Sequence, residues 1–542
     1  MHERIECGAG ARALVGASGG DGMQERGFRG RVPAPGPGPL ADWGWLLLFL
    51  LLVLATQLGS LRREVIDWDE GTFLLMAQDV LRGHLPYTKI YDMKPPGLFL
   101  LLAAPLGIFG ESLAVARLFG DASIVLTAAA TFLAARRYSG SRLAAGLAVL
   151  AMVSALSLPF GLYTSSEILA IAPLAWALLL LMTRRRSFGA SIAVGALLCL
   201  ATLIRTNLAL VVIAVGLLCL AGAFLPRLGF HRRFVAGYVA GGLGPLAALV
   251  LAYWACGALD VLVLGAVTVP RHYSDEMGFV SALRTTRTNA SETARAYPLT
   301  FGILVGLALL GSLSAVARGI EAARRGVDEA GVDALVLWTG AGAVALSILI
   351  SGGGYPHYLL QLYPFAAVSA AWAIGLRPLR PVLAGAVLVS VLAAAAATAR
   401  DTAAVLWDPA AVRASYKVRN AAEAIRADMA PGDRIWTMHE HLVLFYLDRP
   451  PITPVATHPD NIVRASILGP LAEAGYSHAD ELGYILGLRP DYIVNNAYGM
   501  PFYIVGENRT RVAAFLEADY DTWYARDGVV VYRRRSKGRP AG

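Results

Sequence analysis

The 542-residue chain has little charge: Asp, Glu, Lys and Arg make up 16% of it, whereas hydrophobic residues make up 56%. Soluble globular domains carry about 25% charged residues. The hydrophobic residues stand in long blocks with almost no charge inside them, among them 43–55, 169–182 and 382–397. A helix that spans a membrane needs about 20 apolar residues, so these blocks predict spanning helices and exclude an ordinary soluble protein.

Cysteine is scarce as well. The chain has four cysteines, and none forms a CxxC pair or a Cys/His spacing typical of a zinc site. We therefore expect neither a disulfide framework nor a zinc–thiolate site. The sequence also lacks a Walker-type phosphate loop, a GxSxG nucleophile elbow and an internal repeat. The first two absences argue against an ATPase and a serine hydrolase.

Basic residues outnumber acidic ones, 47 to 39, which gives a formal net charge of +8. They do not form one basic run but fall in short clusters between the hydrophobic blocks. Such clusters orient spanning helices, because loops rich in Lys and Arg stay on the cytoplasmic side. We therefore predict no nucleic-acid partner.

Eleven blocks are predicted to span the membrane: 43–60, 113–135, 143–160, 167–183, 188–204, 208–225, 234–256, 298–317, 332–350, 357–376 and 381–399. With this number, five basic clusters fall on one side, which we interpret as cytoplasmic: Arg136-Arg137 with Arg142, Arg184-Arg185-Arg186, Arg227 with Arg232-Arg233, Arg318 with Arg324-Arg325, and Arg377 with Arg380. The apolar segment 98–109 is too short to span and is predicted to be interfacial or re-entrant.

Composition divides the chain into three parts. Residues 1–42, rich in Gly, Ala, Arg and Pro, are predicted to be a disordered cytoplasmic tail. Residues 43–400 hold the spans, with a first extracytoplasmic loop at 61–112. In residues 401–542 charge rises, and apolar runs of strand length alternate with helical stretches. This last part is predicted to be an extracytoplasmic α/β domain.

Several ionisable residues flank the first span, where the neighbouring bilayer offers no water to solvate them. Asp69-Glu70 begin an amphipathic helix, and Lys94 precedes two prolines, which keep it extended. Carboxylates act as general bases or hold hard cations, and lysine binds phosphate. The alternatives are a helix-capping acidic pair and a lysine that extends toward the interface.

Two more charged residues interrupt apolar segments. Glu167 stands at the predicted outer end of the fourth span, and Arg205, with Asn207, lies between two apolar blocks. A buried arginine needs an acid, a phosphate or carbonyl oxygens as its partner. The alternatives are a glutamate at a helix N-terminus and the outer turn of a helical hairpin.

A late span begins with Tyr355-Pro356-His357-Tyr358, and Gln361 follows four residues after His357. Residues four apart share one helix face, so His357 and Gln361 are placed to hydrogen-bond a phosphate or a sugar. An aromatic belt at the membrane interface would explain the tyrosines but not His357 and Gln361.

Together these motifs resemble the membrane-embedded GT-C glycosyltransferases of the protein mannosyltransferase-like type, glycosyltransferase family 39, which include the lipid A aminoarabinose transferases. The resemblance covers about residues 43–400. It consists of Asp69-Glu70 after the first span, Lys94 before two prolines, Glu167 at the fourth span, and the His357-Tyr358-x-x-Gln361 element.

The resemblance implies a polytopic α-helical GT-C fold in the inner (plasma) membrane. It implies transfer of a sugar from a polyprenyl-phosphate donor to an acceptor hydroxyl on the extracytoplasmic face, the acceptor being a lipid, a glycan or a protein. It places the catalytic acid on Asp69, with Glu70 beside it, and the carrier phosphate on Lys94. Glu167 becomes the second acid of the cavity, where the family often has Asp. A divalent metal ion is left open, with Asp69 and Glu167 as its ligands.

The late-span element, Tyr355, His357 and Gln361, is implied to bind the donor. Displacement of a phosphate leaving group requires cations, and Arg205 is a candidate beside Lys94. Two other classes of function compete. Many spans with polar residues near helix breaks fit a transporter of a lipid-linked or small solute. Transporters, however, usually consist of two related halves, and this sequence has no internal repeat. A membrane anchor for residues 401–542 would hardly need eleven spans.

Overall fold

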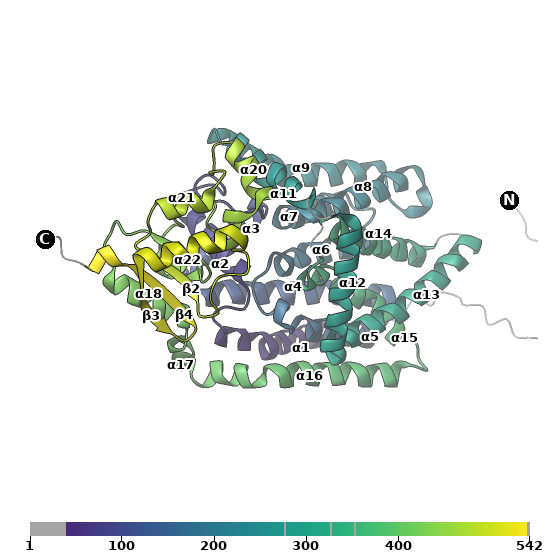
Figure 1. Cartoon of the computed structure of the whole chain (residues 1–542). Helices are drawn as coiled ribbons and strands as arrows, with labels where there is room; N and C mark the ends of the chain where they lie inside the picture. The colour runs from purple at the N-terminus through teal and green to yellow at the C-terminus, as the bar shows by residue number, and fades with distance from the viewer. Residues whose placement is uncertain (1–39, 276–277, 326–327, 352–353, 539–542) are drawn as a thin grey trace, which may run out of the picture. The chain divides into compact units, whose positions relative to one another are not determined.

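The computed structural model describes residues 40–275, 278–325, 328–351 and 354–538. Nearly all of the predicted tail, residues 1–42, lies outside the described residues. From Leu40 to Trp407 the described chain consists of helices joined by loops (Figure 1). The α-helices are α1 Leu40–Gln57, α2 Trp68–Leu81, α3 Pro96–Phe109, α4 Leu113–Ser139, α5 Arg142–Leu156, α6 Ser166–Thr183, α7 Phe188–Ile204, α8 Ala209–Phe224, α9 Arg232–Ala255, α10 Leu259–Val263, α11 Val269–Asp275, α12 Phe279–Ala296, α13 Ile303–Arg325, α14 Glu329–Ile350, α15 Tyr363–Gly375 and α16 Arg380–Trp407.

Within the described residues, eight helical segments are long and apolar enough to cross a membrane: Asp42–Arg62, Leu113–Ser139, Ser166–Thr183, Thr206–Phe224, Arg232–Ala255, Glu329–Ile350, Pro356–Gly375 and Arg380–Trp407. Each coincides with a predicted span. The predicted spans 143–160 and 188–204 correspond to shorter apolar helices, α5 and α7. The block at 298–317 begins at Pro298, after the end of α12, and runs into α13. The segment Pro298–Leu313 is long and apolar enough to cross a membrane only together with α12, from which it is bent by 103°. The total of eleven spans stays a prediction.

The outward faces of these helices are apolar. On α16, Leu388 and Leu392 are each 59% exposed, and on α9, Leu251 is 58% exposed. A protein in water buries most such side chains, whereas hydrocarbon chains solvate them. The small inward-facing residues let helices approach closely, as where Gly195 of α7 meets the backbone of α9 at Tyr238. Both features are those of a helical membrane domain.

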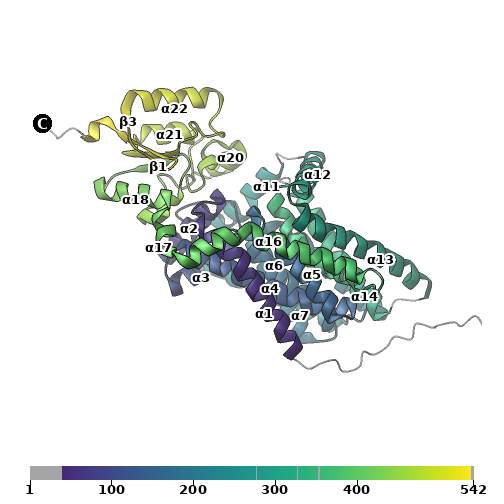
Figure 2. The same cartoon turned by 90° about the horizontal axis from the view of Figure 1, so that it is seen from below.

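The C-terminal part is a small α/β domain (Figure 2). Its sheet has the order β1-β2-β4-β3, in which only the β1–β2 pair is parallel. Tyr492 and Ile493 of β2 are fully buried between the covering helices. Its elements are α17 Pro409–Ala414, α18 Lys417–Asp428, β1 Ile435–Thr437, α19 Leu442–Leu447, α20 Ala465–Glu473, α21 Glu481–Gly487, β2 Tyr492–Asn496, α22 Gly506–Asp519, β3 Tyr520–Arg526 and β4 Val529–Arg534.

Polar contacts join this domain to the loops before and after α2. The Glu64 carboxylate accepts the backbone N–H groups of Val418 (2.7 Å) and Arg419 (2.8 Å) at the start of α18. An acid in this position satisfies free N–H groups and interacts favourably with the helix dipole. Farther along, the Tyr91 N–H donates to the Pro454 carbonyl (2.8 Å). These contacts bring the C-terminal domain against α2, which carries Asp69, and against the loop after it, which carries Lys94.

Candidate active site

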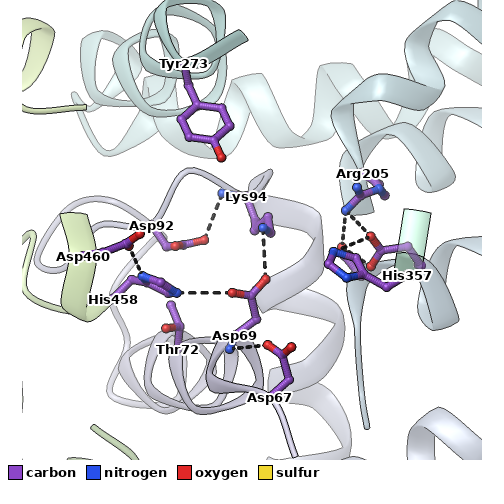
Figure 3. A network of polar contacts seen from close by, with 12 residues as sticks. Asp67, Asp69, Thr72, Asp92, Lys94, Arg205, Tyr273, His357, His458 and Asp460 are labelled. Atoms are coloured by element: carbon purple, nitrogen blue, oxygen red, sulfur yellow. Dashed lines mark hydrogen bonds and ion pairs between the residues drawn. The ribbon is translucent and has the colours of Figure 1, made fainter. Parts of the chain in front are cut away.

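The first predicted acid, Asp69, stands in the first turn of α2. Asp67 precedes the helix, and its Oδ1 accepts the N–H of Asp69 at 2.9 Å. This cap fixes the start of α2, whose first turn carries Asp69. Figure 3 shows the Asp69 carboxylate between Lys94 on one side and His458 on the other.

Lys94 reaches Asp69 from the loop before α3. Its Nζ lies 3.2 Å from Asp69 Oδ2, and the two side chains are 16% and 22% exposed. The backbone of Lys94 is also held, because its N–H donates to Asp92 Oδ1 at 3.0 Å and its carbonyl accepts the Tyr87 hydroxyl at 2.5 Å. Pro95 then enters α3 as its N-cap. Asp69 and Lys94, which were predicted as separate parts of the site, therefore form a direct ion pair between the first turn of α2 and the loop before α3.

The second partner of Asp69 comes from the C-terminal domain. His458 Nε2 lies 3.2 Å from Asp69 Oδ1, and its Nδ1 lies 2.5 Å from Asp460 Oδ1. Burial would raise the pKa of Asp69, but the charge of Lys94 and the bond to His458 hold it well below its usual range. Burial and the nearby Asp69 charge raise the pKa of Asp67 to about 6. Asp69 therefore stays ionised at neutral pH.

Glu70, the neighbour of Asp69, points elsewhere. Arg117 of α4 donates from Nη2 to Glu70 Oε2 at 2.6 Å, and the Thr164 N–H donates to Glu70 Oε1 at 3.0 Å. Arg117 also donates to the carbonyls of Ser60 and Arg63, and its side chain is 1% exposed. Both oxygens of Glu70 are therefore occupied in a buried ion pair that ties α2 to α4.

A second cluster of charges lies beside the first (Figure 3). Arg205, which ends α7, places Nη1 2.7 Å from Glu167 Oε1 and donates from the same nitrogen to Ser166 Oγ at 2.8 Å. Its guanidinium lies 4.0 Å above the ring centre of Tyr358. His357 Nε2 is 3.7 Å from Glu167 Oε1. Three residues predicted from separate motifs, Glu167, Arg205 and His357, are therefore brought together.

The other two residues of the late-span element are placed differently. Tyr355 is 40% exposed and stacks on the His357 ring, with centroids 5.6 Å apart. Gln361 is fully buried, and its Oε1 accepts the Asn207 side-chain amide at 3.0 Å. Asn207 donates to Ser347 as well, at 2.8 Å. Gln361 thus contacts Asn207, which lies between α7 and α8, whereas Tyr355 is at the surface beside His357.

A cavity of about 440 Å³ opens in front of these charges. Lys94, Arg205 and Arg271 provide positive charge in its wall, and Tyr273 and Tyr358 provide hydroxyl groups. Figure 3 shows Tyr273 directed toward the region of Lys94. The remaining wall is largely apolar, formed by residues that include Leu210, Ile213, Ala266, Val267 and Ile350. Such a cavity fits a ligand with an anionic group joined to a hydrocarbon chain.

The arrangement of acids does not fit a resident divalent metal. In the described parts of the chain, no group of three or more His, Cys, Asp and Glu side chains could hold a metal ion. The two expected ligands are already paired with cations, Asp69 with Lys94 and Glu167 with Arg205. A metal would have to displace a lysine or an arginine, so we derive no step through one.

His458 and Asp460 were not predicted from the sequence. No site was predicted in the C-terminal domain, and no sequence pattern around these two residues marks them. Two acids flank the His458 ring only after the domain packs against α2. Arg117 was also missed, although an arginine within a predicted span is a signal that could have found it.

No protein-family model matches the sequence, and a search of curated protein sequences found no match. Two solved structures of ArnT from Cupriavidus metallidurans are similar in fold. The one bound to undecaprenyl phosphate has a TM-score of 0.61 at 15% identity, covering 92% of this chain and 99% of that chain. The apo structure has a TM-score of 0.60 at 16% identity, covering 92% and 100%. The chain has the ArnT fold. The predicted fold class, a polytopic helical GT-C-type protein with a C-terminal α/β domain, is therefore confirmed.

The buried Glu70–Arg117 pair makes a prediction about stability. In Glu70→Gln, Arg117 keeps its charge but loses its counter-ion, which costs about 3–5 kcal/mol for a buried pair. We expect thermal unfolding in detergent to occur several degrees lower. Glu423→Gln breaks the exposed pair with Arg419 and serves as the control, for which a shift near zero is expected. Equal unfolding temperatures for the two variants would contradict the structural role of Glu70.

The His458 environment predicts a pH dependence of stability. Burial would lower the pKa of His458, but the Asp460 carboxylate and the bond to Asp69 raise it from 6.5 to about 10. The stabilisation is therefore complete below pH 6.5 and is lost as pH rises toward 10. We expect the unfolding temperature of the wild type to fall over this interval more steeply than that of His458→Gln. Parallel curves for the two proteins would rule this out.

Proposed function

We propose that this protein is a glycosyltransferase that moves a sugar from a polyprenyl-phosphate donor to an acceptor hydroxyl at the extracytoplasmic face of the membrane. The observation that carries the proposal is the cavity itself. It joins an apolar wall to Lys94, Arg205 and Arg271, directly beside the ionised Asp69. A lipid-linked phosphate needs both kinds of wall, and a reaction on its sugar needs the adjacent carboxylate.

The donor phosphate is assigned to the space between Lys94 and Arg205. Each of these cations has a carboxylate partner, Asp69 and Glu167 respectively. An arriving phosphate offers Lys94 a counter-ion of higher charge, and lysine binds phosphate as a point charge. The apolar wall then accommodates the first isoprenoid units. The solved ArnT with undecaprenyl phosphate supports this proposal through its shared fold.

Asp69 is assigned the role of general base. When Lys94 moves to the phosphate, Asp69 Oδ2 loses its partner and becomes available to the acceptor. The acceptor oxygen attacks the anomeric carbon, its proton passes to Asp69, and the bond from that carbon to the phosphate oxygen breaks. Lys94 and Arg205 neutralise the charge that develops on the departing polyprenyl phosphate. Such electrostatic stabilisation is usually the largest contribution to catalysis.

The remaining predicted residues are given supporting roles. Glu167 orients Arg205, and His357 packs against that pair at the cavity edge. Tyr355 stacks on His357 and is assigned to the entrance. Gln361 supports the junction with Asn207 rather than the donor, and Glu70 anchors the start of α2. The hexosyl or pentosyl nature of the sugar belongs to the same proposal.

We further propose a multi-pass inner-membrane location, with the N-terminus cytoplasmic and residues 401–542 outside. The transmembrane catalytic domain is then 43–400, and the first extracytoplasmic loop is 61–112. Supporting this, Glu167 and Arg184 stand at opposite ends of α6, about 25 Å apart for 17 residues of helix. This separation supports placing the site charges and the arginine cluster on opposite sides of the hydrocarbon layer, the orientation that the positive-inside rule favours.

The central prediction concerns turnover of a radiolabelled polyprenyl-phosphate sugar pool by purified protein. Asp69→Asn removes the base, and we expect the rate to fall by about 10²–10⁴-fold. Lys94→Ala removes a phosphate partner and should raise the donor KM as well as lower the rate. The labelled product of the wild-type protein identifies the acceptor.

The matched control for Lys94 is Lys89→Ala, because Lys89 is an exposed lysine of the same loop. Its turnover should equal that of the wild type. If Asp69→Asn is as active as wild type, the base assignment fails. If the wild type neither binds nor turns over a wide panel of carriers, the transferase proposal fails, and transport is the function to test.

The charge pairing of Asp69 and Glu167 predicts that turnover survives metal removal. We expect activity within twofold of the untreated value after dialysis against EDTA, since Lys94 and Arg205 already supply the positive charge beside the two acids. A loss of activity that returns on addition of Mg²⁺, Mn²⁺ or Zn²⁺ would show that a metal ion takes part.

A further inference from the structure

The C-terminal domain supplies a chain of charged groups that ends on Asp69. Arg464 donates from Nε to Asp460 Oδ2 at 2.7 Å, and Asp460 Oδ1 lies 2.5 Å from His458 Nδ1. The other ring nitrogen of His458 lies 3.2 Å from Asp69 Oδ1. Figure 3 shows the His458 ring between the two carboxylates. The Asp69 carboxylate, which lies on α2, is therefore contacted by a histidine of the C-terminal domain.

The position of His458 is fixed by its surroundings. His458 is 8% exposed, and the Trp68 ring packs edge-on against its imidazole, with 4.6 Å between the ring centroids. Pro459 follows it and begins a short 3₁₀ helix, Pro459–Val463, which also carries Asp460. The preceding Thr457 carbonyl accepts the Thr72 hydroxyl at 3.4 Å. These contacts leave the imidazole one orientation, with its ring aimed at α2.

The partners of the ring determine which proton steps it can perform. Each ring nitrogen faces a carboxylate oxygen, and a carboxylate only accepts hydrogen bonds. Both nitrogens therefore carry hydrogen, and the imidazolium has no lone pair with which to take a proton from the acceptor. His458 consequently cannot replace Asp69 as the base. It can hold one oxygen of Asp69 in place.

We propose that the C-terminal domain completes the catalytic site by using His458, braced by Asp460, as a positioning residue for Asp69. His458 holds Oδ1, so that Oδ2 alone turns toward the acceptor when Lys94 moves to the donor phosphate. The acceptor proton is transferred to Oδ2, and His458 keeps both of its hydrogens throughout. This inference rests on the proposed function and assigns the domain a part in the reaction itself.

Kinetics of the full-length protein test this role. In His458→Ala we expect kcat to fall about 100-fold, while the donor KM and the binding of undecaprenyl phosphate change less than twofold. His458→Gln retains an N–H donor near the position of Nε2 and should recover at least tenfold of the loss. Asp460→Asn should fall between these two variants. His478→Ala, an exposed histidine of the same domain, is the control and should match the wild type.

A double variant separates positioning from general stability. Because His458 acts through Asp69, adding His458→Ala to Asp69→Asn should slow the reaction less than threefold beyond Asp69→Asn alone. A further 100-fold loss would overturn the proposal, as would wild-type kcat in His458→Ala or a loss confined to KM. If His458→Ala does not fold, His458→Gln is combined with Asp69→Asn instead. The smaller fall in kcat expected for His458→Gln alone must then be absent when Asp69→Asn is already present.

The two proposals fail in different ways. If the wild type turns over the donor and His458→Ala is equally fast, only the role of His458 is wrong. If the wild type turns over no polyprenyl-phosphate sugar, the proposed function is wrong, and the role of His458 falls with it.

Discussion

The buried ion pair between Arg117 and Glu70 is the interaction on which the site depends. Arg117 binds Glu70 and also three carbonyls of the segment between α1 and α2, at Ser60, Arg63 and Glu64. A buried pair of this kind is costly to desolvate, so it contributes specificity of arrangement more than net stability. Here it fixes the start of α2 against α4. Asp69 is the preceding residue and takes its direction from that anchor.

Charge compensation governs the rest of the site. Lys94 is paired with Asp69, and Arg205 with Glu167, so neither cation is left bare beside the membrane. Unpaired charges there would be expensive. The same pairing keeps the cations in place for a phosphate, and exchange of a carboxylate for a phosphate costs little because one counter-ion replaces another. In the proposed reaction this exchange also activates the base, which links donor binding to chemistry.

Local sequence could predict part of this arrangement. The apolar blocks predicted eight segments that the structure confirms as long and apolar enough to span, because block length is a local property. Asp69, Lys94, Glu167, Arg205 and His357 could be selected because ionisable residues beside apolar segments are rare. That these five meet at one cavity edge follows from helix packing, which no single motif encodes. The motifs suggested the grouping through the family resemblance only.

Other features could not be predicted. Consecutive helix residues point about 100° apart, so the adjacent Asp69 and Glu70 separate into a site residue and an anchor. His458 lies 389 residues from Asp69, in a loop without a periodic pattern. Its role depends on packing of the C-terminal domain through contacts such as Glu64 with the start of α18.

A cryo-EM structure of the full-length protein with undecaprenyl phosphate would test the proposed donor site most directly. We expect phosphate density in contact with both Lys94 Nζ and the Arg205 guanidinium, with the isoprenoid chain along the apolar wall of the cavity. We also expect that Lys94 has left Asp69 while His458 remains bound to it. Phosphate density elsewhere, or an intact Lys94–Asp69 pair beneath the bound lipid, would show that Lys94 and Arg205 do not bind the donor phosphate as proposed.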